Sequence, residues 1–555
     1  MWTSLSQTNQ HRELRVILVL LACYIGNTVQ QRDPISNFCR RWGHQSAVVD
    51  NKLYIDGGLV TWTPSSQPPE NYTNPYFVYH DLSQNASSGM PPPYANLSKN
   101  SSIPNVSGAM LWPDDINKRI YLFGGEFYDE PPWPFALYSY DIINDYWVNH
   151  GAPGSPDIGS LSYGAGLSIS SRGEGYYYGG WMNNATDASW GGGPGILTSY
   201  LLKYDMDSNL WTNTTTLDKV GRAEGVMVYI PAGDGGMIIY FGGIREAGNG
   251  TWEGQPMEEI IIYDILSGKP YVQNATGNVP EPRRRFCAGV TWPDDQSSYN
   301  IYLYGGAGKA EGNVGFDDIY VLTIPTFTWI RIYPTDSNKM GDFPHHSLSC
   351  NVVNKAQMLI HGGFFPLNND CDSPEQWGLH NLDMGKKNSY NSPWALYDPS
   401  KTHYVVPIDI ISVVGGSAEG GANKTAPTDG FDHQDLRALM TRKASAASRN
   451  PTRAIPGEDL CPKQGLSIGA IAGIAVGGLV ILNAVLVSAF YLIRRRRRRK
   501  MADRSDRPIT QSYPHHHPPQ SSNRSHQYSQ SPPPFQSRPQ TVPRHAGPPV
   551  ELPSG

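Results

Sequence analysis

A pair of glycines that directly follows a short apolar strand recurs along most of this chain. The strand-plus-glycine stretches are LYIDGG (Gly57, Gly58), IYLFGG (Gly124, Gly125), YYYGG (Gly179, Gly180), IIYFGG (Gly242, Gly243), IYLYGG (Gly305, Gly306) and MLIHGG (Gly362, Gly363). A weaker seventh copy, ISVVGG, ends at Gly416. The first glycines of successive pairs lie 53 to 67 residues apart. A repeat of this length predicts an array of similar β units, each too small to bury its own apolar face.

A second strand follows each doublet and contains a tyrosine, usually an aspartate, and an aromatic residue seven to nine positions later. The copies are Tyr140, Asp141 and Trp147; Tyr204, Asp205 and Trp211; Tyr263, Asp264 and Tyr271; and Tyr320 with Trp329. We interpret the aromatic residues as buried surface between units, with a polar end for hydrogen bonding. Glycine after the first strand allows the backbone to turn at positive φ.

These motifs resemble the kelch family and, more loosely, the central propeller of the galactose oxidase type. The resemblance covers roughly Arg40 to Gly416 and implies an all-β propeller of six blades, with seven as the alternative. Closure into a ring leaves only short, protected strand edges. Two units depart from the pattern, because no clear tryptophan follows Tyr79 and Leu382 stands where tyrosine is usual. We expect residues 404–416 to pack as a closing or accessory strand.

The two ends of the chain predict a single-pass protein of the plasma membrane. Residues 1–30 have the charged lead-in and short apolar run of a secretory signal. Residues 466–493 are almost uninterruptedly apolar and long enough for a transmembrane helix. The cations Arg494–Lys500 follow directly and place the C-terminus in the cytoplasm. The propeller, residues 31–416, is then extracellular.

The remaining segments have the composition of connectors. Residues 417–465, rich in Gly, Ala, Ser and Pro, predict a flexible stalk, within which only 432–443 has a helical pattern. Residues 494–555 combine the basic stop-transfer run with a Pro-, His- and Ser-rich tail that we expect to be disordered. Within the apolar segment, Gly469, Gly473 and Gly477 are spaced for close helix–helix contact and predict a homodimer.

Glycosylation sequons and cysteines agree with passage through the secretory pathway. The predicted acceptors are Asn71, Asn85, Asn96, Asn100, Asn105, Asn184, Asn213, Asn249, Asn274 and Asn423. Of six cysteines, Cys23 would leave with the signal, so an odd number remains and the disulfide pairing is open. Cys461 is the candidate for a bond between chains.

Charge argues against a nucleic-acid partner. The net charge is −5, and it falls to −12 when the seven consecutive cations of Arg494–Lys500 are left out. We interpret these cations as a topology signal that contacts anionic lipid headgroups.

Function is predicted as non-catalytic recognition, adhesion or sensing, with no cofactor or metal. The order of segments resembles membrane-anchored kelch proteins of filamentous fungi, which implies a protein or cell-wall polysaccharide as partner. Candidate ligand contacts are Trp62, Trp133 and Trp190, because exposed tryptophans stack on sugars.

The alternative is a membrane-tethered, carbohydrate-active propeller enzyme, such as a copper radical oxidase. Its chemistry needs histidines and a tyrosine crosslinked to cysteine. The histidines His44, His345, His346, His361 and His380 sit at dissimilar places in the repeat, and His361 is interpreted as a packed repeat position.

Overall fold

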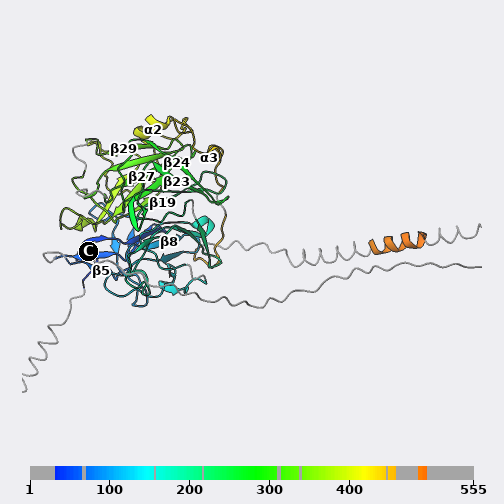
Figure 1. The fold of residues 1–555 in the computed structure, drawn as a ribbon, viewed down its shortest axis with the longest axis horizontal. Helices are drawn as coiled ribbons and strands as arrows, with labels where there is room; N and C mark the ends of the chain where they lie inside the picture. Colours follow the sequence, from blue (N-terminus) through cyan, green and yellow to red (C-terminus); the bar gives the residue numbers. More distant parts are fainter. Residues whose placement is uncertain are drawn as a thin grey trace, which may run out of the picture. The chain divides into compact units, whose positions relative to one another are not determined.

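A computed structural model describes most of the chain as an all-β protein. The described residues are 32–64, 70–154, 158–215, 218–308, 314–336, 341–445, 448–457 and 485–496. The chain divides into two units, residues 1–460 and 461–555, and the sheets of the described residues lie in the first. Figure 1 shows the described strands of that unit packed as successive sheets, with the two short helices α2 (Ile408–Val414) and α3 (Gln434–Leu439) beside them.

Six antiparallel sheets follow one another along the described chain. The first contains β2 (Gln45–Val49), β3 (Lys52–Asp56), β6 (Val78–Asp81) and β7 (Pro93–Tyr94); the second β8 (Met110–Asp114), β9 (Arg119–Phe123), β10 (Tyr138–Asp141) and β11 (Tyr146–Asn149); the third β12 (Ala165–Ile169), β13 (Glu174–Tyr178), β16 (Tyr200–Asp205) and β17 (Leu210–Thr215). The fourth contains β19 (Val226–Ile230), β20 (Met237–Phe241), β23 (Glu259–Asp264) and β24 (Lys269–Asn274); the fifth β26 (Cys287–Thr291), β27 (Tyr299–Tyr304), β28 (Ile319–Ile324) and β29 (Thr328–Tyr333), with β25 (Thr276–Gly277) parallel to β29; the sixth β30 (Ser349–Val353), β31 (Gln357–His361) and β32 (Leu379–Asp383).

Smaller sheets extend the loops that follow three of the doublets. They are β1 (Phe38–Trp42) with β4 (Leu59–Trp62) and β5 (Tyr72–Thr73); β14 (Trp181–Met182) with β15 (Ile196–Leu197); and β18 (Arg222–Ala223) with β21 (Ile244–Gly248) and β22 (Thr251–Gly254). In the sixth sheet, Trp394 forms an isolated bridge to Leu382 in place of a full fourth strand.

The first strands of the six sheets form a closed ring. β2, β8, β12, β19, β26 and β30 are neighbours in that order, and β30 returns to contact β2. Together they surround a central channel of about 480 Å³. Two disulfides reinforce the ring: Cys287–Cys350 joins β26 to β30, and Cys39–Cys371 joins the N-terminal strand β1 to the loop ahead of β32.

A hydrophobic cluster fills each interface between neighbouring sheets. One cluster, for example, joins Tyr54 of the first sheet to Leu111 and Tyr140 of the second. Another joins Phe241 of the fourth sheet to Trp329 of the fifth, whose indole N–H donates to the Met257 carbonyl at 2.9 Å. The repeat aromatics therefore lie between sheets, as the sequence predicts, and Trp329 satisfies its indole N–H there.

The glycine doublets make the contact between one sheet and the next. The second glycine of each pair donates its N–H to a carbonyl just ahead of the next sheet: Gly58 to Val106, Gly125 to Leu161, Gly180 to Arg222, Gly243 to Arg283, Gly306 to His345 and Gly363 to Arg41, all at 2.7–2.9 Å. Both glycines of every pair have positive φ. A Cβ on Gly57, Gly124, Gly179 or Gly362 would lie 2.2–2.3 Å from that same carbonyl oxygen. Glycine is thus required at the doublet for two reasons: the turn needs positive φ, and the next unit approaches too closely for a side chain.

Replacing Gly179 with alanine tests this requirement. The Cβ would meet the Arg222 carbonyl at 2.2 Å at φ +67°, so we expect a loss of about 3 kcal/mol or more in the free energy of unfolding. Gly151→Ala is the matched control, because Gly151 also has positive φ but has no atom within 4 Å of the added Cβ, and its backbone strain should cost about 1–2 kcal/mol. Urea unfolding measures both; equal losses would contradict the close-approach argument.

Residues 404–416 and the predicted stalk differ from expectation. Instead of an accessory strand, residues 408–414 form the helix α2, which buries Ile410 and Val414 against the fifth and sixth sheets. Farther on, Leu436 of α3 is fully buried in the core between the fourth and fifth sheets. Figure 1 shows α3 near β23 and β24. A few apolar residues in a Gly- and Ser-rich segment therefore suffice to dock it.

We call residues 417–457 the strap, because their described part runs across the ends of successive sheets opposite the doublets. Arg449 forms two-pronged ion pairs with Asp114 and Asp207 at 2.6–2.9 Å, and Arg453 binds Asp141 of β10. The Arg449 side chain is 7% exposed and that of Asp114 is fully buried. The expectation of a flexible stalk at 417–465 is therefore wrong for the described part of the strap.

Removing Arg449 should destabilise the protein strongly. Arg449→Ala leaves the buried carboxylate of Asp114 without its cation, which typically costs about 3–5 kcal/mol. Arg442→Ala is the matched control in the same strap, because the Arg442–Asp234 pair is about half exposed and should contribute about 1 kcal/mol or less. Thermal and urea unfolding of the two variants compare them; a strap that contributes nothing would leave both at the wild-type midpoint.

Several predictions from the ends of the chain lie outside the described residues. These are the signal at 1–30, Cys461, Gly469, Gly473, Gly477 and most of the apolar segment 466–493. Residues 485–496 are helical. No helix within the described ranges has both the length and the apolar character needed to cross a membrane.

Candidate functional site

Six residues form the mouth of the central channel, and we call them the channel mouth. They are Gly43, Gly108, Tyr163, Glu224, Arg285 and Ser347, one ahead of the first strand of each sheet. Each N–H donates to the carbonyl of the preceding member at 2.7–2.9 Å, and the sixth bond closes the circle. All six have φ between 51° and 64°, a region that is unfavourable for the four non-glycine residues. The circle therefore holds Tyr163, Glu224 and Arg285 in fixed positions around a cavity of about 140 Å³.

Charge at the channel mouth is concentrated on one carboxylate. Glu224 is almost fully buried and accepts from Arg284 at 2.9 Å, Arg285 at 2.8 Å and the Trp181 indole at 3.1 Å. Burial alone would raise the pKa of Glu224, but the charges and hydrogen bonds of Arg285 and Arg284 outweigh it and hold the pKa below its usual value. The Arg285 guanidinium also lies over the Tyr163 ring, 4.1 Å from its centre. This network of ion pairs and hydrogen bonds around Glu224 holds the channel mouth in place.

A second concave region lies between the fifth and sixth sheets, and we call it the acidic cleft. It consists of two cavities of about 390 and 270 Å³ that share Asp342, Phe343, His345 and His380. His380 lies on β32 and forms a 2.7 Å hydrogen bond with Asp372, which is buried in the loop ahead of that strand. Burial lowers the pKa of His380, but the charge and hydrogen bond of Asp372 outweigh it and leave the pKa raised. The loop at 341–343 is fixed by Asp317, whose oxygens accept from the Gly341 and Phe343 N–H groups.

Three other histidines are packed inside the protein between the sixth and first sheets. His361 Nδ1 lies 3.0 Å from His44 Nε2, and the His80 ring is 5.9 Å from that of His361. Burial, together with the charge of Arg41, lowers the pKa of His44 to about 3 and that of His80 to about 4, and burial lowers that of His361 well below the usual value. All three are therefore neutral in the folded protein at ordinary pH. His361 is deeply buried, as a packed repeat position should be.

Stability should fall as the pH drops through the histidine range. A depressed pKa in the folded state means that the unfolded chain binds more protons below about 6.5, so unfolding becomes easier as the medium acidifies toward pH 4. Between pH 7 and 5 the loss should be on the order of 2 kcal/mol for each fully buried histidine. His80→Asn retains a donor for the Pro91 carbonyl and should flatten the decline of Tm with acidity. His403→Asn, at an exposed site, is the control and should leave the slope unchanged.

The predicted tryptophan contacts are not brought together. Each follows a different doublet, in the first three units. Trp62 is buried edge-on against Tyr76, Trp133 packs against Phe127, and the half-buried Trp190 donates to the carbonyl of Gly193 in its own loop at 3.0 Å. None of them lines the channel mouth or the acidic cleft. Their role as ligand contacts stays a prediction.

The sequons are accessible in the described structure. Nine of the ten asparagines are exposed, and Asn105 is half-buried. Accessibility is what N-glycosylation requires, and their modification stays a prediction.

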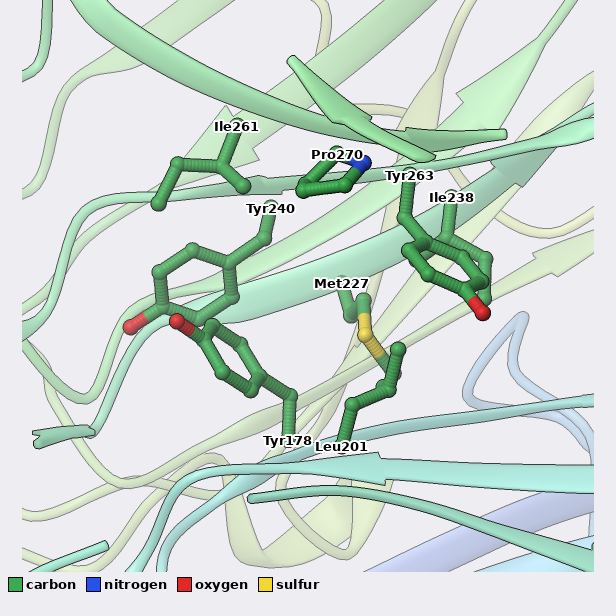
Figure 2. A pocket seen from close by; sticks show the side chains of 8 residues that line it. All are labelled: Tyr178, Leu201, Met227, Ile238, Tyr240, Ile261, Tyr263 and Pro270. Atoms are coloured by element: carbon green, nitrogen blue, oxygen red, sulfur yellow. The ribbon is translucent and has the colours of Figure 1, made fainter. Parts of the chain in front are cut away.

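One further cavity is a packing gap. Figure 2 shows it between the third and fourth sheets, with Tyr178 and Tyr240 facing each other among Met227, Leu201 and Ile238. At about 30 Å³ it is large enough for water and too small for an organic ligand.

The sequence analysis named His44, His345 and His380 for the alternative enzyme, and the other charged side chains of the two concave regions escaped it. Glu224 and Arg285 occupy the same place in successive repeats, directly before the first strand, and alignment of the doublets with that position would have found them. His380 and Asp372 carry no spacing signal. Among the described residues, no group of three or more His, Cys, Asp or Glu side chains has the arrangement of a metal site.

A ring of antiparallel sheets around a channel, with loops and a charged mouth on one face, defines a β-propeller. Among characterised sequences, the chain is similar to a "Kelch repeat-containing protein" of Arthroderma benhamiae: the two are 29% identical over 551 residues, which covers 87% of this chain and 80% of the relative. The resemblance to kelch-repeat proteins is thus confirmed. No family model matches the chain.

A solved structure described as "Structure of YjhT" matches 63% of this chain and 98% of its own chain. Its sequence identity is 15% and its TM-score is 0.43, a level of similarity that supports no argument about function.

Proposed function

We propose that this chain is a non-catalytic, six-bladed kelch propeller that acts as a recognition, adhesion or sensor scaffold at the cell surface. Its ligand would be a protein or a cell-wall glycan, bound by the propeller loops. The main support is that the six segments between a doublet and the third strand of its sheet all leave from the same face of the propeller. These segments, which we call the doublet-face loops, are the described parts of 59–77, 126–137, 181–199, 244–258, 307–318 and 364–378.

A rigid frame that presents variable loops is the usual arrangement for binding. The backbone circle at the channel mouth and the doublet hydrogen bonds fix the ends of these loops. By contrast, most strands are joined by shorter connections on the opposite face, and the strap covers that face in part. The doublet face is therefore the one available for a partner.

The structure at the seventh doublet supports six blades rather than seven. Gly415 caps α2 by donating its N–H to the Ile411 carbonyl, and no sheet of the described chain follows it. Each of the other six doublets leads into its own sheet, and the ring of first strands closes with six members.

A location outside the cell is supported by two disulfides and the exposed sequons. Disulfides persist in oxidising compartments and are rare in the cytosol. Placement of the C-terminus in the cytoplasm, and a single membrane span, rest on the sequence alone.

The alternative, a copper radical oxidase, lacks a free thiol in the described propeller. That chemistry requires a cysteine bonded to a tyrosine, whereas Cys39, Cys287, Cys350 and Cys371 are all paired in disulfides. This observation favours binding over oxidation.

Variants on the two faces test the proposal. The intact protein would be assayed on arrays of cell-wall polysaccharides and on purified surface proteins. Tyr128→Ala, at a side chain 55% exposed on a doublet-face loop, should weaken the binding severalfold, since exposed aromatics are frequent anchors. Leu210→Ala, at a residue 64% exposed at the opposite end of the third sheet, is the control and should leave binding unchanged.

Equal loss in both variants would contradict a doublet-face site. Production of peroxide from sugar alcohols by the wild-type protein would contradict the non-catalytic assignment.

A further inference from the structure

The acidic cleft has the dimensions of a ligand site. Its larger cavity, about 390 Å³, falls within the range of organic-ligand pockets, and the adjoining one adds about 270 Å³. Asp342 and Phe343 lie between the two cavities and line both. The walls come from the fifth sheet, through Tyr304 and Tyr333, and from the sixth sheet, through His380 and Trp394. The cleft is thus an elongated groove at the junction of two blades.

The groove carries an excess of negative charge. Asp317, Asp342, Asp370 and Asp372 line it, and no lysine or arginine of the described chain does so. Behind it, the buried Arg40 attracts Asp370 and Asp372, and His380 pairs with Asp372, so the excess is reduced but not cancelled. Asp342 and Asp370 are exposed.

One oxygen of the buried Asp372, a residue that lines the groove, has no hydrogen-bond partner among the described residues. Asp372 is 2% exposed; its Oδ1 accepts from His380, while no atom of the described chain hydrogen-bonds its Oδ2. An unsatisfied buried polar atom is costly unless something else satisfies it. The missing hydrogen bond is a feature separate from the excess of negative charge in the groove.

Apolar side chains at the rim complete the pattern. Phe343 is 70% exposed and Leu367 is 54% exposed, although both are large hydrophobic residues. Both border the cavity that Asp370 and Asp372 line. Exposed apolar surface beside an open groove is typical of protein-interaction sites.

We propose that the acidic cleft binds a basic peptide segment of a partner protein, with an arginine or lysine side chain in the groove and a neighbouring apolar residue on Phe343 and Leu367. Carboxylates supply the charge complement, and Tyr304 and Trp394 contribute aromatic surface to the wall. A polymer of amino sugars offers the same cation and a face for the Phe343 ring, but the aliphatic Leu367 beside that ring matches an apolar side chain rather than a sugar. The peptide is therefore the better fit. This inference deepens the proposed scaffold function and rests on it.

The experiment uses the full-length protein and a fluorescent nonapeptide library with a central arginine or lysine flanked by leucine or phenylalanine. Each peptide is paired with a version in which citrulline or acetyl-lysine removes the charge. Anisotropy titrations should show binding of the cationic members, weaker at high salt, and little binding of their neutral counterparts.

The double variant Asp342→Asn, Asp370→Asn removes two exposed charges without touching the core. It should lower the affinity about tenfold, the size expected from two partly exposed charge pairs. Asp294→Asn, at a side chain 77% exposed outside the cleft, is the control and should keep wild-type affinity. Phe343→Ala should weaken peptides with an apolar neighbour more than those without one.

Other outcomes overturn the proposal. Absence of charge-dependent binding, or binding that the double variant does not change, removes the cleft as the site. Competition by oligoglucosamine at lower concentration than the best peptide would replace the peptide with a sugar. In each of these cases, the comparison of Tyr128→Ala with Leu210→Ala still tests the scaffold function separately.

Discussion

The hydrogen bond from the second glycine of each doublet to the carbonyl ahead of the next sheet is the contact on which this structure depends. It occurs six times, and the last bond, from Gly363 to Arg41, returns to the first unit. Because a carbonyl approaches the first glycine so closely, a side chain there is excluded in most units. Steric exclusion therefore fixes the distance between sheets, and the hydrophobic clusters between them fill the space that this distance leaves.

The same contact positions the functional face. Two residues after the bonded carbonyl, in every unit, the chain reaches the channel mouth. There the second circle of hydrogen bonds holds Tyr163, Glu224 and Arg285 in left-handed conformations. Strain of this kind persists only when the surrounding structure determines it on several sides. The doublets thus set both where the loops begin and how little their bases can move, which suits recognition by loops on a rigid frame.

The sequence predicted the repeats well because each repeat signals itself locally. Apolar strands, doublets and the Tyr–Trp partners are short-range patterns. It failed where the determinants are few or far apart. Leu436 and Arg449 dock a segment whose average composition is that of a linker, and their partners lie far away in the chain: Asp114 is 335 residues from Arg449. Asp317, Asp342 and His380 come from three separate segments, so no spacing in the chain relates them.

Charge is used differently on the two ends of the sheets, and this difference separates structure from recognition. Opposite the doublets, Asp114, Asp141 and Asp207 form ion pairs with arginines of the strap, so their charges are paired within the chain. On the doublet side, Asp342 and Asp370 border an open groove next to the exposed Phe343. Buried ion pairs mainly maintain a fold once both partners are in place, whereas carboxylates left beside exposed apolar surface are available to a cation from outside. The strap, by occupying one end of the sheets with its own arginines, illustrates the type of basic segment that the acidic cleft at the other end is suited to receive.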